Sequence, residues 1–189
     1  MPRELFDHAM LGALYRYWQA KRGARAMPAR QDIDPVEMEP RLLPHLMLCE
    51  VAQHGSHVRF RLVGTSLAKR LGFDPTGQSL SDLPEGDYFD FLGRLLRRSY
   101  AEAAPVYGES MFRWGVKSHL EARHLLLPLS AGGVEPAIVL VGTAYSSDDV
   151  FPPNIRTLCS MARHSVLKRE MVVLPVPVRP AAEQSANVA

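Results

Sequence analysis

The sequence lacks long apolar runs, a charge of one sign and a cysteine framework, and each absence excludes a class of protein. No apolar run reaches the roughly 20 residues that cross a bilayer, and Glu4, Asp7 and Arg16 interrupt the N-terminal segment, so we expect neither a signal peptide nor a spanning helix. The 22 basic side chains nearly balance the 20 acidic ones, which argues against a nucleic-acid-binding protein. Cys49 and Cys159 have no metal or redox spacing, so we expect buried free thiols in a cytoplasmic protein.

Common catalytic and metal-binding motifs are also missing. The chain has no glycine-rich phosphate loop, no nucleophile elbow and no paired His-Glu helix of a zinc protease. His54 and His57 share a loop without a third ligand, so they make a weak case for a metal site. The acidic stretch around Asp34-Pro35-Val36-Glu37 has a capping acid, a proline and a second acid, which is typical of a helix start rather than of a cation loop.

Apolar periodicity predicts an α+β fold with an antiparallel sheet, because two strands, then helices, then three strands follow one another instead of alternating strand and helix. The strands are expected over residues 46–52, 58–64, 105–113, 119–129 and 136–145. The helices are expected over residues 4–22, 65–72 and 87–103, with a final helix ending near residue 170. The proline-containing end of the chain, after residue 171, is expected to be flexible.

The junction between the second strand and the first short helix is the most informative stretch. Val58, Phe60 and Leu62 alternate with two arginines, so these three side chains are predicted to share the buried face of a half-buried strand. The strand runs into a short helix, which Thr65 can cap and Gly72 can close. No catalytic group is needed to explain this pattern.

The first helix has a wide apolar surface. Leu11, Leu14, Tyr15 and Trp18 extend this surface beyond one face. Two explanations are open: the helix packs on its own domain, or it forms a contact between two copies of the chain. The second explanation predicts a homodimer through the N-terminal helix, which deletion of residues 1–22 would disrupt.

Four motifs follow one another in the first quarter of the chain: Trp18, Met27-Pro28-Ala29-Arg30, Asp32-Ile33-Asp34-Pro35 and Leu42-Leu43-Pro44-His45. Together they resemble the PAS domains found as small stand-alone proteins in alpha-proteobacteria. The resemblance covers roughly residues 18 to 146 and implies a PAS-like five-stranded antiparallel sheet with flanking helices. Together with the helix and strand patterns, it divides the chain into an N-terminal helical extension (1–40), a PAS-like domain (41–146), a C-terminal helix (147–171) and a tail (172–189).

The resemblance implies a non-catalytic sensory or protein-interaction module in bacterial signal transduction, whose output passes through a partner protein. Relatives that bind haem have a histidine in the long helix, and flavin-binding photoreceptors have an asparagine-cysteine-arginine motif before it. Residues 87–103 contain no histidine, and the cysteine motif is absent. We therefore expect a protein without haem or flavin.

A small apolar ligand is expected between the sheet and the long helix, where the same residues can also be plain core. The predicted lining residues are Phe60, Leu62, Leu71, Phe91, Leu95, His124, Leu126 and Leu140. The alternative function is a small-molecule enzyme of a cone-shaped α+β fold, in which a buried pair of His124 and Asp90 takes a proton. A cavity around a polarised pair would favour the enzyme, whereas a closed apolar core would favour the interaction module.

Overall fold

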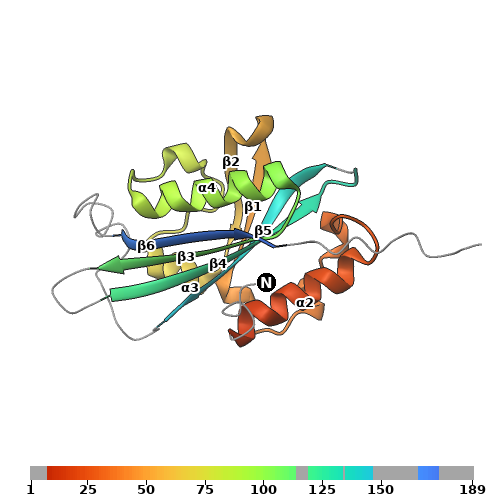
Figure 1. Cartoon of the computed structure of the whole chain (residues 1–189), viewed down its shortest axis with the longest axis horizontal. Coiled ribbons are helices and arrows are strands. Elements are labelled where there is room, and N and C mark those ends of the chain that lie inside the picture. Colours follow the sequence, from red (N-terminus) through yellow and green to blue (C-terminus); the bar gives the residue numbers. More distant parts are fainter. Residues whose placement is uncertain (1–7, 114–118, 134, 147–165, 175–189) are drawn as a thin grey trace, which may run out of the picture.

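The computed structural model describes residues 8–113, 119–133, 135–146 and 166–174, and within these residues one antiparallel sheet organises the chain (Figure 1). Its strands are β1 (Leu46–Ala52), β2 (His57–Val63), β3 (Val106–Arg113), β4 (His119–Ser130), β5 (Pro136–Tyr145) and β6 (Val166–Val173). The α-helices are α2 (Ala9–Arg22), α3 (Thr65–Leu71) and α4 (Asp87–Glu102). Single-turn 3₁₀-helices are η1 (Arg30–Asp32), η2 (Pro35–Glu37), η3 (Leu43–His45), η4 (Gln53–Gly55) and η5 (Leu80–Asp82).

The strand order is β2-β1-β5-β4-β3-β6, and every neighbouring pair is antiparallel. The long helix α4 lies across one face of the sheet and α2 lies across the other (Figure 1). Side chains of a strand alternate between the two faces, so each strand contributes to two separate cores. This arrangement confirms the predicted α+β class, the antiparallel sheet and the hairpin of β1 and β2.

The predicted count of five strands is too low, because residues 166–173 form a sixth strand in the described structure. The prediction of a helix through residue 171 is therefore wrong over residues 166–171, and its earlier part lies outside the described residues. The segment is rich in valine, which favours a pleated strand, and it pairs with β3 from Val106 opposite Val173 to Phe112 opposite Val166. Leu174 follows the strand, is buried, and donates its N–H to the Pro105 carbonyl at 2.8 Å. The predicted flexible tail is therefore wrong over residues 172–174, and the rest of it lies outside the described residues.

The apolar residues of α2 pack on the sheet of their own chain. Leu11, Leu14, Tyr15 and Trp18 are all fully or almost fully buried, and the Trp18 indole N–H donates to the carbonyl of Pro128 on β4 at 2.9 Å. The first of the two explanations for the wide apolar surface is therefore confirmed. These four side chains are therefore not available for contact with a second copy, and the homodimer through the N-terminal helix stays a prediction without their support.

A β-bulge moves Leu62 away from the face that the alternating pattern predicts. Cys49 pairs with Phe60, but the next residue, Leu48, pairs with Leu62, so Arg61 is an extra residue in β2. An extra residue inverts the alternation beyond it, because successive side chains point to opposite faces. Leu62 is 46% exposed on the side of the sheet away from α4, and its predicted place beside Phe60 is wrong.

Local signals at the helix ends are mostly confirmed. Asp34 accepts a hydrogen bond from the Val36 N–H at 2.9 Å and caps η2, as its motif predicts. Gly72 ends α3 in the left-handed conformation, with φ of 81°. The capping position of α3 is Gly64 rather than the predicted Thr65. The chain passes close to η3 at Gly64, where an added Cβ would lie 2.5 Å from the carbonyl carbon of Pro44.

Candidate functional site

Six of the eight predicted lining residues lie on the α4 side of the sheet. They are Phe60, Leu71, Phe91, Leu95, His124 and Leu126, and all six are buried. The other two belong to the opposite side: Leu62 is turned outward by the bulge, and Leu140 packs in the core beneath α2. The prediction that all eight line one space is therefore wrong for Leu62 and Leu140.

The middle of α4 packs tightly on the sheet. Leu95 is fully buried, and a Cβ added to Gly108 on β3 would lie 2.7 Å from both of its Cδ atoms. Real Cβ atoms do not approach so closely, so Gly108 provides the space that Leu95 occupies. At this position the structure supports the reading of Leu95 as core.

His124 lies beneath the first half of α4, between aromatic rings. Its ring centroid is 5.8 Å from that of Tyr88 and 6.3 Å from that of Phe91, and its Nδ1 is 3.0 Å from the Thr143 hydroxyl on β5. Burial lowers the pKa of His124 to about 4, so the imidazole is neutral near pH 7. Its Nε2 and the Ser110 hydroxyl of β3 are buried and have no hydrogen-bond partner within the described residues. Buried polar atoms of this kind are usually satisfied by an internal water.

The proposed catalytic pair does not form. Asp90 is exposed on α4, whereas His124 is fully buried, and the hydrogen bond that His124 makes goes to Thr143. A general base needs its partner within hydrogen-bond reach or one bridging water away, which does not hold for Asp90, exposed on α4, and His124, buried beneath α4 on β4. The prediction of a buried pair of His124 and Asp90 is therefore wrong.

The described ranges contain no candidate metal site. There, no group of three or more His, Cys, Asp or Glu side chains has a geometry that could hold a metal ion. Cys49 is buried, as expected, and burial raises the pKa of its thiol. Cys159 lies outside the described residues. Within the described residues, no helix has the length and apolar character needed to cross a membrane.

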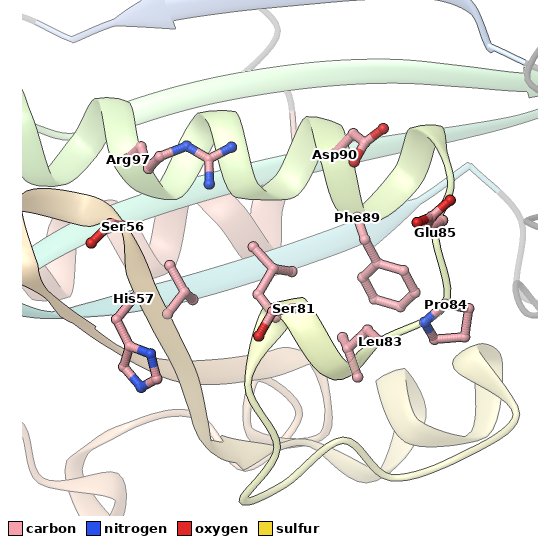
Figure 2. A pocket seen from close by; sticks show the side chains of 11 residues that line it. Ser56, His57, Ser81, Leu83, Pro84, Glu85, Phe89, Asp90 and Arg97 are labelled. Carbon is pink, nitrogen blue, oxygen red and sulfur yellow. The ribbon is translucent and has the colours of Figure 1, made fainter.

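A pocket of about 270 Å³ opens beside α4, where this helix, β2 and the segment around η5 meet (Figure 2). We call it the α4 pocket. Its lining residues are Ser56, His57, Val58, Leu80, Ser81, Leu83, Pro84, Glu85, Phe89, Asp90 and Arg97. Its apolar floor consists of Val58, Leu83 and Phe89, which are buried, and its rim is polar.

The rim of the α4 pocket has opposite charges at its two ends. Arg97 lies at the same end of the pocket as Ser56 and His57, whereas Glu85 and Asp90 lie at the other end (Figure 2). The guanidinium group of Arg97 extends along α4 over Gly93, where an added Cβ would lie 3.2 Å from Nη2 and 3.4 Å from Nη1. Among the described residues, Arg97, Glu85 and Asp90 form no ion pair. The arrangement can bind a small molecule that has both polar and apolar parts.

The α4 pocket was not predicted from the sequence. Asp90 and Arg97 are seven residues apart, which is about two turns, so a helical reading of residues 87–103 already places them on one side of the helix. The floor and the other rim residues come from β2 and η5, and no local pattern predicts that these segments meet α4.

A second hollow lies on the opposite side of the sheet, between η3, β1 and β2. It has a volume of about 380 Å³, and we call it the Leu62 groove. Its lining residues are Arg30, Ile33, Pro35, Met38, Leu43, Pro44, Leu46, Leu48, Leu62, Val63, Gly64, Thr65 and Leu140. Leu43 and Leu62, 37% and 46% exposed, give this groove an accessible apolar wall. Two of the predicted lining residues, Leu62 and Leu140, meet here rather than beneath α4.

Comparison with known proteins agrees with this architecture. The family model described as PAS domain matches residues 6–143, which is most of the chain. A search of curated proteins finds no match.

Proposed function

The chain belongs to the PAS domain family, and we propose that it is a non-catalytic sensory module of bacterial signal transduction that binds a small molecule in the α4 pocket. PAS domains in general serve as sensory and interaction modules. The observation that carries the proposal is the α4 pocket itself, with a buried apolar floor and a rim of charged side chains that have no ion pair among the described residues. Ligand sites commonly combine an apolar lining with a few convergent polar groups.

The position of the pocket gives a bound molecule a route to the core. Phe89 forms part of the floor, and its ring centroid is 5.2 Å from that of the preceding residue, Tyr88. Tyr88 in turn contacts the His124 ring and has its hydroxyl 3.2 Å from that of Tyr145 on β5. A ligand that moves the start of α4 would therefore change how this helix packs on the sheet. Between two positions of α4, a ligand favours the one that it binds more tightly, by the difference between its two binding free energies.

The absence of an assembled His124–Asp90 pair supports the non-catalytic assignment. We infer that the output passes to a partner protein, since a sensory module needs an effector to produce a response. We also propose that the protein is cytoplasmic.

The test is whether a side chain that fills the α4 pocket abolishes binding. Ser81 is exposed at the pocket rim, so Ser81→Trp adds bulk there without disturbing buried groups. The matched control is Lys69→Trp, an exposed position on α3 that does not line the pocket. Each protein is incubated with the small-molecule fraction of a bacterial lysate and analysed by native mass spectrometry.

We expect the unmodified protein and Lys69→Trp to retain the same small molecule and Ser81→Trp to lose it, with similar melting temperatures for all three proteins. Equal retention by Ser81→Trp would place the site elsewhere. Failure of every protein to retain any molecule would also contradict the proposal.

A further inference from the structure

We propose that the α4 pocket binds an amino acid with an apolar side chain, an inference that rests on the proposed function and specifies its ligand. The carboxylate of the ligand would lie on Arg97, its ammonium group on Asp90 and Glu85, and its side chain on the apolar floor. Three features of the pocket lead to this assignment: the distance between its charges, the chemistry of its rim and the size of its interior.

The opposite charges lie about one helical turn apart along α4. The Arg97 guanidinium lies over Gly93, three residues after Asp90, which is a rise of about 4.5 Å along the helix axis. Arg97 and Asp90 nevertheless form no ion pair with each other. A molecule with its own adjacent carboxylate and ammonium groups can bridge the two side chains. A single anion or cation would satisfy one of them and leave the other unpaired.

The side chains on the rim match the two groups of an amino acid. A guanidinium group binds a carboxylate through two parallel N–H···O hydrogen bonds, and this geometry is specific to planar anions. The carboxylates of Asp90 and Glu85 are acceptors for an ammonium group. Gly93 lets the Leu80 side chain and the Arg97 guanidinium lie close against the helix, because an added Cβ would lie 2.8 Å from Leu80 Cδ2 and 3.2 Å from Arg97 Nη2.

The interior of the α4 pocket limits the size and polarity of the ligand. Its volume of about 270 Å³ is slightly below the range of about 300–1,000 Å³ that is usual for ligand sites. Val58, Leu83 and Phe89 form the floor, so a leucine-sized or phenylalanine-sized side chain suits this space better than a polar one. The ligand class is therefore a free amino acid rather than a nucleotide or a large cofactor.

The test uses sets of probes that differ by one charged group. L-leucine is compared with 4-methylpentanoate, which lacks the ammonium group, and with 3-methylbutylamine, which lacks the carboxylate. L-phenylalanine is compared in the same way with 3-phenylpropanoate and 2-phenylethylamine. Isothermal titration calorimetry on the full chain gives each affinity. We expect at least one amino acid to bind more tightly than both of its analogues, by about two- to fivefold, because Glu85, Asp90 and Arg97 are exposed and contacts between exposed charges are weak.

Variants test which end of the pocket binds the carboxylate of the ligand and which end binds its ammonium group. Arg97→Gln should reduce the affinity for the amino acid to that of the amine analogue. The double variant Glu85→Gln/Asp90→Asn should reduce it to that of the carboxylate analogue. Arg98→Gln and Glu102→Gln are the controls, because this exposed pair lies on the same helix but does not line the α4 pocket, and both should bind as the unmodified protein does.

Amino acids that bind no more tightly than their analogues would overturn the inference, and so would an Arg97→Gln variant with unchanged affinity. The two proposals fail in different ways. If Ser81→Trp loses a retained molecule that has one charge or none, the sensory pocket stands and the amino-acid assignment falls. If Ser81→Trp retains that molecule, the site lies elsewhere and both proposals fall.

Discussion

Replacing Gly108 with alanine tests how completely the middle of α4 fills its side of the sheet. The new Cβ would lie 2.7 Å from both Cδ atoms of Leu95 and 3.3 Å from its Cγ. Leu95 is fully buried, so its side chain can yield only by repacking against the surrounding core. Overpacking of this kind costs about 1–3 kcal/mol, and we expect Gly108→Ala to reduce the free energy of unfolding by that amount.

A double-mutant cycle identifies Leu95 as the cause. Leu95→Ala alone removes a buried side chain and should cost about 2–5 kcal/mol. It also removes the three atoms that the Gly108→Ala methyl group would overlap. The double variant should therefore be more stable than the sum of the single changes predicts, by about 0.5–3 kcal/mol.

Urea denaturation followed by far-ultraviolet circular dichroism measures the four free energies, and an unchanged m-value shows that the comparison is valid. Gly133→Ala is the control, since no atom lies within 4 Å of its added Cβ, and it should change stability by less than about 0.5 kcal/mol. A neutral Gly108→Ala, or strictly additive effects, would refute the reasoning. A neutral Gly108→Ala would show that the Leu95 side chain moves aside, and strictly additive effects would show that Leu95 is not the group that limits packing at Gly108.

Two further predictions concern buried groups. The pKa of His124 is about 4 in the folded protein and 6.5 without burial, so the unfolded state takes up the proton first. Protonation of this group should lower the free energy of unfolding by on the order of 3 kcal/mol between pH 6.5 and pH 4. Urea titrations should show that the free energy of unfolding of His124→Phe depends less on pH. An equal pH dependence of the variant and the unmodified protein would contradict the assignment. Gly64→Ala would place a Cβ 2.5 Å from the carbonyl carbon of Pro44, a backbone atom that cannot rotate away. It should lower stability by at least about 1–3 kcal/mol in the same assay, and a melting temperature equal to that of Gly133→Ala would show that η3 can move aside.

Patterns that depend on neighbouring residues were predictable from the sequence. Asp34 caps η2 because its own side chain reaches the Val36 N–H, and this geometry depends on the local chain alone. The strands β1, β3, β4 and β5 follow from apolar runs between turn residues, and their observed bounds lie within one residue of the expected ones. The long helix also starts at residue 87 as expected.

Features that depend on a distant partner were not predictable in this way. The position of Leu62 depends on a bulge, which arises from the pairing of β2 with β1. The strand β6 depends on the free edge of β3, about 60 residues earlier in the chain, and its valines and leucine are also compatible with a helical stripe. The α4 pocket depends on η5 and β2 meeting α4, so its charged rim appears only in three dimensions.

Hydrogen exchange on the full chain tests the central claim most directly, because it shows where a bound molecule acts. The rates are compared by mass spectrometry with and without the small molecule that native mass spectrometry detects. We expect slower exchange in residues 80–97, which include η5 and the part of α4 that lines the pocket, and no change in residues 33–48 along the Leu62 groove. Slower exchange confined to residues 33–48, or no change at residues 80–97, would contradict it.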